Sequence, residues 1–274
     1  MKVHFLGTAA AEGFPNVYCH CQTCQTARER GGRDIRTRCS VIVDDVLKVD
    51  HGPDSYMQAL RDDIDMSLIQ DILMTHTHFD HLCPGDIISR MKGYAHGIET
   101  PLNIYGNELA LYQYRTALLE EGEEDEQNQF HRLKPFQTVQ IGEASVTPLY
   151  ADHDQNEMCL LYFIEKKGKS ILYGHDTGWF PEETWTWLET KKIDMAILDC
   201  TTGQTGHKRG RGHMSVETVI EVHKMFQEKN ILNENARIVV THFSHNGRLL
   251  HDDLEAIFKP YGVEVAYDGM VLNL

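Results

Sequence analysis

Short apolar runs typical of β-strands recur along the chain, and polar residues directly follow many of them. Helical patterns, several of which open with Ser, Asp or Pro, alternate with the later runs. We expect strands at 2–7, 39–45, 46–50, 71–76, 102–106, 144–150, 158–165, 169–174, 194–199, 237–242 and 263–269. We expect helices at 55–63, 85–93, 108–121, 181–190, 215–230 and 251–259. This order fits two packed sheets with helices outside them.

The length and composition favour one globular unit. The chain has 274 residues, 41% of them hydrophobic, which is enough to bury a sizeable core. We find no internal repeat or linker, so we expect a single domain over residues 1–274, with the acidic run 120–126 as a solvated loop. No run reaches the roughly 18 apolar residues of a membrane span, and the start does not read as a signal peptide, so we expect a cytoplasmic protein without a membrane partner.

Net charge and cysteine spacing indicate which ligands the protein can bind. A formal net charge of −15 argues against a broad nucleic-acid surface, although it leaves room for a local cationic pocket. Three of the seven cysteines lie in "CHCQTC" (19–24), a spacing too tight for ordinary disulfides but suited to a metal. We therefore expect a reducing compartment and a metal-binding segment near the start.

Several predicted strands end in a residue that can bind a metal. A rigid sheet presents a site in this way, with side chains drawn from distant parts of the chain. The strand-end residues are Asp50, His76, His153, Asp176, Asp199 and His242. In "HTHFDH" (76–81), the first two histidines can face one ion, and Asp80 with His81 can face another. Imidazole and carboxylate suit zinc, manganese or iron(II).

The segment "HTHFDH" resembles the H-x-H-x-D-H signature of the metallo-β-lactamase superfamily. The resemblance implies an α/β (α+β) fold, the αββα sandwich, and two catalytic divalent ions, zinc or manganese. It implies that His76, His78 and His153 hold the first ion and Asp80, His81 and His242 the second, with Asp176 as a bridge.

Three further assignments depend on this resemblance. It implies that Asp50 supports catalysis by orienting the ligands through hydrogen bonds. Asp152 competes with His153 for one ligand position, and His175 competes with Asp176 for another. Spacing alone does not separate these pairs, whereas the family pattern favours His153 and Asp176.

The cysteine segment predicts a structural zinc. Cys19, Cys21 and Cys24 supply three thiolates on one tight loop, and tetrahedral zinc needs a fourth ligand. His20, Cys39 and His245 are the candidates, and free thiols or an iron–sulfur site are the alternatives. The combination of C-x-C-x-x-C with "THFSH" (241–245) is similar to the PhnP-type phosphodiesterases, which implies His245. Such a zinc would fasten an N-terminal loop to the segment that carries His242.

The PhnP-type resemblance runs nearly end to end and implies a phosphodiesterase. The opening "FLGTAAAEGFP" (5–15) departs from it at Ala9, where a glycine is usual, but "LDCTTG", "GHMSVET" and "VAYDGM" all match. The implied substrates are cyclic ribose phosphates or related small phosphodiesters, and the resemblance also implies a homodimer. His213 in "GHMSVET" would contact the phosphate or protonate the leaving oxygen as a catalytic residue.

A basic stretch precedes this histidine. Lys208, Arg209 and Arg211 lie in the glycine-rich "GHKRGRGH" (206–213) and could bind a phosphodiester, or could belong to a solvated surface loop.

Three other functions are weighed against the phosphodiesterase. A PqqB-like carrier or binding protein would share the fold and the cysteine segment, but the complete ligand set favours a hydrolase. An RNA-end nuclease is disfavoured because the one candidate insertion, 119–128, is acidic. Thioester or lactam hydrolases of this superfamily lack the cysteine set.

Overall fold

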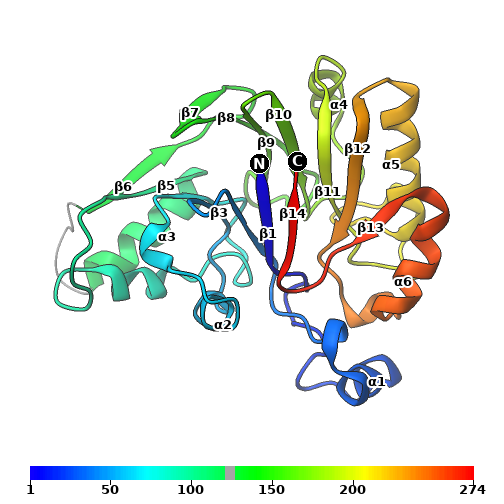
Figure 1. Ribbon diagram of the computed structural model, residues 1–274, viewed down its shortest axis with the longest axis horizontal. Coiled ribbons are helices and arrows are strands. Elements are labelled where there is room, and N and C mark those ends of the chain that lie inside the picture. Colours follow the sequence, from blue (N-terminus) through cyan, green and yellow to red (C-terminus); the bar gives the residue numbers. More distant parts are fainter. Residues whose placement is uncertain (121–126) are drawn as a thin grey trace.

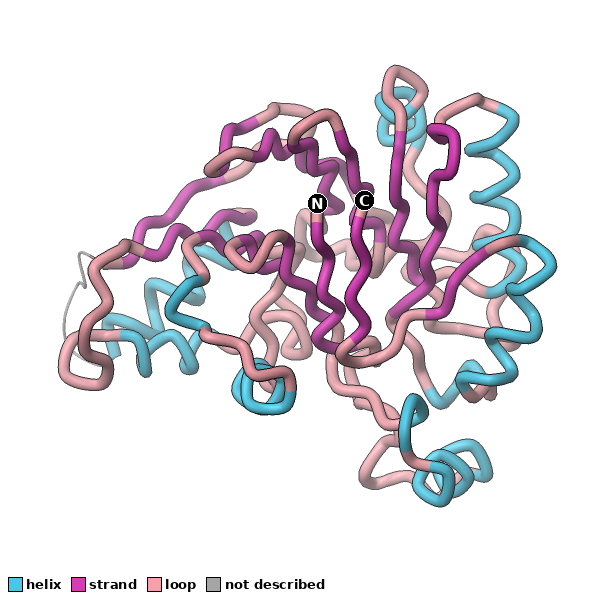
Figure 2. The backbone as a smooth tube through the Cα atoms, viewed as in Figure 1, coloured by secondary structure: helices cyan, strands magenta, loops and turns pink. Residues whose placement is uncertain are grey.

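Two β-sheets face each other at the centre of the molecule and helices cover their outer faces (Figure 1). The computed structural model describes residues 1–120 and 127–274. Within these residues each sheet has seven strands, ordered β14-β1-β2-β3-β4-β5-β6 and β13-β12-β11-β10-β9-β8-β7. Figure 2 shows the two layers of strands with the helices around them. The predicted αββα sandwich is therefore confirmed.

The strands of the first sheet come from both ends of the chain. They are β1 (Lys2–Gly7), β2 (Ser40–Val43), β3 (Leu47–Val49), β4 (Asp71–Leu73), β5 (Leu102–Gly106), β6 (Asn128–Arg132) and β14 (Met270–Asn273). The second sheet contains β7 (Val139–Ile141), β8 (Ala144–Tyr150), β9 (Leu160–Lys166), β10 (Lys169–Gly174), β11 (Ile193–Asp199), β12 (Leu232–Thr241) and β13 (Val263–Val265). Because β14 pairs antiparallel with β1, the two termini lie side by side in Figure 1.

Helices lie between and beyond these strands. The α-helices are α1 (Gln22–Arg30), α2 (Ser55–Arg61), α3 (Glu108–Glu120), α4 (Glu182–Leu188), α5 (Val216–Glu228) and α6 (His251–Phe258). The short 3-10 helices are η1 (Gly32–Asp34), η2 (Met66–Leu68), η3 (Pro84–Arg90), η4 (His245–Gly247) and η5 (Lys259–Tyr261). None of the described helices is long and apolar enough to span a bilayer.

Apolar side chains fill three layers. Phe5 and Leu73 from the first sheet pack with Tyr162 and Ile197 from the second in the layer between the sheets. A second layer lies between the second sheet and helices α5 and α6, and a third lies between the first sheet and α3. Both faces of the central strands are thus buried, which explains why β11 reads as a nearly continuous apolar run.

The main differences from the expected elements are short or polar segments. Helix α1 and strands β6, β7 and β14 were not predicted; β7 and β14 have three and four residues, and α1 buries only Cys24 and Ala27. The helix expected at 85–93 is the 3-10 helix η3, because so short an apolar pattern does not separate the two helix types. The end of the helix expected at 108–121 and the acidic run after Glu120 lie outside the described residues.

Candidate metal centre

The predicted ligands converge because parallel strands end at the same edge of each sheet. Strands β3 and β4 are parallel, as are β10, β11 and β12, so the residues that follow them meet where the two sheets approach. The loops after β3, β4, β8, β10 and β12 carry the predicted centre: Asp50, His76, His78, Asp80, His81, His153, Asp176 and His242.

Three histidines form the first group. Ring nitrogens of His76, His78 and His153 lie within 4.8 Å of one another. In each ring the other nitrogen makes a hydrogen bond that fixes the orientation. His78 Nε2 donates to Asp154 at 3.0 Å and His153 Nδ1 donates to a backbone carbonyl at 2.9 Å. The remaining nitrogens, His78 Nδ1 and His153 Nε2, are 3.1 Å apart and point to a common space, as ligands of one ion do.

Two carboxylates and two histidines form the second group. Ligand atoms of Asp80, His81, Asp176 and His242 also lie within 4.8 Å of one another, and all four residues are buried. Nε2 of His81 is 2.9 Å from Asp80 Oδ2 and 2.5 Å from Asp176 Oδ2. The Nε2 atom of His242 is 3.2 Å from the same oxygen of Asp176.

Asp176 connects the two groups. Its Oδ2 lies 3.7 Å from Nε2 of His76, and its Oδ1 lies 3.9 Å from Nε2 of His153, while Oδ2 also meets the second group. A shared carboxylate offsets the repulsion between two cations held about 3.5–4 Å apart. The geometry therefore fits a bridging role for Asp176.

The buried polar atoms of this centre fit a pair of cations. Within the described residues, five buried atoms lack a hydrogen bond although they lie close together: Nε2 of His76, His81 and His242 and both carboxylate oxygens of Asp176. Such atoms are costly to bury unless they bind something. Burial lowers the pKa of His81, but Asp80, Asp176 and Asp50 outweigh burial and raise that pKa well above its usual value. The same negative field favours a divalent ion.

Asp50 and its neighbours hold the second group in place. Asp50 Oδ2 accepts from Nδ1 of His81 at 2.8 Å, and Oδ1 accepts from the backbone N–H of Thr75 at 2.9 Å. Burial raises the pKa of Asp50, yet His81 and His175 lower it further, so the carboxylate stays ionised. The hydroxyl of Thr201 plays a similar part at His242, accepting from Nδ1 at 2.8 Å.

The two competing ligand candidates point elsewhere. Asp152 pairs with Arg211 at 2.7 Å and takes no place in either group. The ring of His175 lies 3.0 Å from the Tyr173 hydroxyl and 3.5 Å from Asp50, behind His81. The structure thus brings His153 and Asp176 into the centre, as the family pattern implies.

His213 lies at the rim of the centre. Its Nδ1 donates to Asp199 at 2.9 Å and is 3.3 Å from Oδ1 of Asp176, and its side chain is 29% exposed. Burial lowers the pKa of His213, but Asp199 and Asp176 outweigh burial and raise it. The ring is therefore fixed beside the two metal groups, and the two carboxylates stabilise its protonated form.

The basic stretch is paired with acids. Lys208 and Arg209 contact Glu221, at 3.5 and 2.5 Å, and Arg209 also stacks on Trp179. Arg211, held by Asp152, is adjacent in sequence to Gly212, whose carbonyl binds the ring of His153. Of the three predicted substrate-binding residues, Arg211 thus has the most direct link to the centre.

The cysteine segment meets His245 as expected from the family. Sulfur atoms of Cys19, Cys21 and Cys24 lie within 4.8 Å of one another and of a ring nitrogen of His245. Nδ1 of His245 is 3.5 Å from Cys21 Sγ. Burial raises the pKa of Cys21, but the Cys24 N–H and His245 outweigh it and lower the pKa to about 6, so this sulfur is a thiolate at neutral pH.

The segment itself differs from the expected loop. Cys21 is the N-cap of α1, its Sγ accepting from the Cys24 N–H, and Cys24 lies in the first turn of that helix. Cys39, another candidate for the fourth ligand, is buried elsewhere with Sγ 3.4 Å from Thr241 Oγ1.

Several supporting residues were not predicted. Asp154 orients His78, Thr201 orients His242, and Glu157 accepts from the backbone N–H and hydroxyl of Thr77 between two ligands. Asp154 and Glu157 lie one and four positions after His153 in "HDQNE". This proximity to a predicted ligand is the one sequence feature that could have indicated them.

Similar proteins agree with this architecture. The chain is 25% identical to an octanoyltransferase of Porphyromonas gingivalis over 98% of its own length but only 51% of that protein, so it spans about half of this relative. A crystal structure of a diphosphatase from the PhnP family has a TM-score of 0.78, with 22% identity over 100% of this chain and 97% of that one. Zinc-bound PqqB from Methylobacterium extorquens has a TM-score of 0.76, with 20% identity over the whole of both chains.

A family model settles the relationship. Residues 46–243 match the model of the beta-lactamase superfamily domain, a range that contains all seven predicted ligands of the two groups and Asp50. This range is well over half of the chain, and the protein therefore belongs to the beta-lactamase superfamily domain family.

Proposed function

We propose that this protein is a metal-dependent phosphodiesterase that acts on small phosphodiesters such as cyclic ribose phosphates. The observation that carries the proposal is the pair of ligand groups joined by Asp176, with His213 fixed beside them. Likeness to a PhnP-family diphosphatase supports the choice of phosphate chemistry.

Each residue of the centre has a distinct role in the proposed hydrolysis. Divalent ions in the two groups would lower the pKa of water from about 15.7 to about 7 and would offset the charge of a phosphate. Asp176 places negative charge between the two groups, Asp80 adds negative charge to the second group, and Asp50 keeps the ring of His81 in orientation. His213 is positioned to give a proton to the departing oxygen, because its Nδ1 is held by Asp199 while its Nε2 makes no hydrogen bond within the described residues.

The three basic side chains of the basic stretch are paired with carboxylates. They can contact a phosphate only by leaving these carboxylates or by binding the phosphate and the carboxylate together. Arg211 is bound to Asp152 on the loop that carries His153, so it is the best placed of the three basic residues to bind a substrate oxygen. Lys208 and Arg209 would first have to leave Glu221.

Hydrolysis of bis(p-nitrophenyl) phosphate tests the proposal. Protein loaded with manganese or zinc should release nitrophenol, and His76→Ala should nearly abolish this activity. His96→Ala is the matched control, because His96 is an exposed histidine outside both groups. Full activity in His76→Ala would remove the centre from the mechanism. Ribose cyclic phosphates, cyclic nucleotides and linear diesters should then be compared as substrates.

The principal alternative is a PqqB-like binding protein that does not catalyse hydrolysis. The likeness to zinc-bound PqqB along both chains favours it. The two proposals differ in one measurement: a binding protein would hold metal without turning over any diester in the panel. p-Nitrophenyl octanoate belongs in the same panel because of the octanoyltransferase relative, and faster cleavage of this ester than of the diesters would overturn the phosphodiesterase proposal.

A further inference from the structure

A cavity of about 530 Å³ lies between α2, η2 and η3. Its volume is within the range of about 300–1,000 Å³ found for small-molecule sites. Its walls are mostly apolar and include Ala59, Met66, Ile69, Ile72, Ile87 and Ile88. Among the described residues that line it, none is a predicted ligand of the two metal groups.

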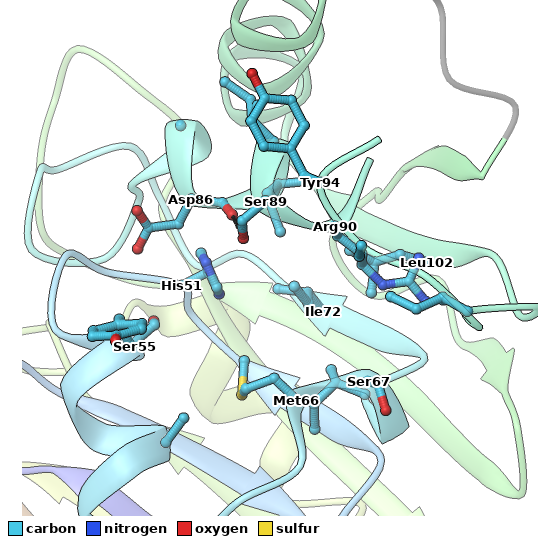
Figure 3. Close-up of a pocket in the computed structure, with 18 residues that line it drawn as sticks. His51, Ser55, Met66, Ser67, Ile72, Asp86, Ser89, Arg90, Tyr94 and Leu102 are labelled. Atoms are coloured by element: carbon cyan, nitrogen blue, oxygen red, sulfur yellow. Dashed lines mark hydrogen bonds between the residues drawn. The ribbon is translucent and has the colours of Figure 1, made fainter. Parts of the chain in front are cut away.

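One polar side chain is built into this apolar wall without a partner. The imidazole of His51 is buried, with 5% of the residue exposed, and neither ring nitrogen has a hydrogen bond within the described residues. Figure 3 shows the ring directed into the cavity, between Asp86 and Ile72. A buried imidazole normally has a partner, so its lack of one here indicates a ligand atom.

The backbone keeps His51 in this position. Its N–H donates to the carbonyl of His81 at 2.8 Å, and its own carbonyl accepts from Cys83 at 2.7 Å. The residue is thus fastened on both sides to the segment that joins the metal ligands to η3. Its ring is held at the cavity by the same backbone contacts that position the metal loop.

The lining specifies the chemistry of an occupant. Apolar walls favour an aliphatic chain, and the single imidazole favours one polar group that accepts or donates a hydrogen bond. The Asp86 carboxyl lies at the same end as His51 and disfavours an anionic headgroup there, as does the net charge of −15. The one cation among the described residues of the lining, Arg90, lies at the other end near Leu102, where its Nη2 donates to the carbonyl of Thr100. At about 30 Å³ for a water-sized group, 530 Å³ holds about seventeen such groups, so an eight-carbon amide, with about ten non-hydrogen atoms, fits inside the cavity.

We propose that this cavity binds the aliphatic chain of a neutral acyl amide or ester, with His51 donating a hydrogen bond to the acyl carbonyl. The cavity and His51 carry this inference, which stands independently of the phosphodiesterase function. Binding, and not turnover, is therefore its readout.

Calorimetric titration of the metal-loaded protein with octanamide, hexanamide and butanamide tests the chain-length requirement. Octanamide should bind at one site per chain, and each loss of two methylene groups should weaken binding roughly tenfold. Octanoate should bind more weakly than octanamide because of Asp86. Absence of saturable octanamide binding, or equal affinity for the three amides, would overturn the proposal.

Three variants locate the site. Ala59→Trp fills the cavity and should abolish octanamide binding, whereas Leu60→Trp, at the next position of α2 with 61% exposure, should leave it unchanged. His51→Leu should weaken octanamide binding by about tenfold while preserving the chain-length dependence. Thermal melting reports whether each variant folds.

Methyl NMR of the wild-type protein tests the location of the site even if a variant does not fold. Octanamide should shift the methyl NMR resonances of Ile72 and Ile87 in the wild-type chain, and it should leave those of Ile238, in the opposite helix layer, unchanged. Equal binding in Ala59→Trp and wild type, or methyl shifts that avoid the cavity, would contradict the assignment.

Discussion

Asp50 shows how one buried residue can hold a ligand in place. It accepts hydrogen bonds from Thr75 and His81 and adopts the left-handed backbone conformation, with φ 61°. Asp176 and His242 share this conformation, with φ 51° and 62°. Such backbone costs on the order of 1–3 kcal/mol per residue and persists where the surroundings enforce it, commonly at functional sites. Three of the residues of the centre are therefore fixed by their backbone as well as by their contacts.

Replacing Asp50 should loosen the metals without unfolding the chain. Asp50→Ala removes the acceptor of His81 Nδ1, and loss of such a supporting carboxylate typically weakens metal binding by about 10–100-fold. Competition with a chromogenic chelator measures the change. Asp50→Asn, which retains an acceptor oxygen and tolerates left-handed backbone, should lie between wild type and the alanine variant. Unchanged affinity in Asp50→Ala would contradict the supporting role.

His213 should matter for turnover and not for metal binding. His213→Gln keeps polarity but cannot donate a proton as an acid, so kcat for a diester with a poor leaving group should fall by about 100-fold or more. Metal content should stay at the wild-type value. The loss should be much smaller for a nitrophenyl diester, whose leaving group needs little protonation, and an equal loss for both substrates would argue for a purely structural role.

Metal uptake should release protons. In the metal-free chain, carboxylates outweigh burial and raise the pKa of His81 and of His242, so these rings keep a proton at neutral pH and lose it as pH rises through the raised pKa. A metal needs the neutral ring, and its affinity must therefore increase with pH. Calorimetry in buffers of different ionisation enthalpy measures the release; an enthalpy that is the same in all buffers would contradict it.

The sequence indicated the candidate ligands but not the residues that orient them. Each ligand ends an apolar run or belongs to a dense His/Asp motif, and the structure brings all seven together. Asp154 and Thr201 contact ligands from loops, and only the folded chain places them. Spacing alone left His20, Cys39 and His245 open as the fourth ligand of the cysteines. The family resemblance implied His245, and the folded chain places its Nδ1 3.5 Å from Cys21 Sγ.

At the scale of elements, one contact ties α1 to the active-site loop. β12 ends at Thr241, His242 follows as a predicted metal ligand, and His245 opens η4 against the cysteines at the start of α1. Glu12 adds a contact at 3.6 Å to Nε2 of His245, which leaves Nδ1 for the sulfur cluster. A zinc held there would connect the N-terminal segment to β12.

Loss of this connection should lower stability. Cys21 is exposed, so Cys21→Ser creates no cavity, and its effect would come from the weakened zinc site. We expect Tm to fall by at least about 4 °C, equivalent to roughly 1–2 kcal/mol for a chain of this size. Cys83→Ser is the control, since Cys83 lies outside the cluster. Equal melting of both variants and wild type would show that no zinc stabilises this segment.

Element prediction succeeded where burial was strong and failed where it was weak. Strands such as β10 and β11 are buried along most of their length, and their apolar runs were recognised. Helix α1 is polar in sequence and buries only Cys24 and Ala27, of which Ala27 packs with Ala9, Phe14 and Leu250. No periodicity argument could find it.

At the scale of the whole molecule, the two sheets serve to bring distant loops together. The first sheet supplies the 76–81 motif, and the second supplies His153, Asp176 and His242. Neither sheet alone holds a complete ligand group for two ions. The strand order that pairs β1 with β14 and β10 with β11 depends on contacts across the chain, and periodicity did not specify it.

Counting the metals in the purified protein tests the central claim most directly. The account predicts about three metal ions per chain by elemental analysis: two in the Asp176-linked groups and one zinc in the cysteine cluster. In Asp176→Ala the count should fall toward one, and in Cys21→Ser it should fall toward two. A wild-type count of one or none after incubation with zinc or manganese would contradict the dinuclear centre.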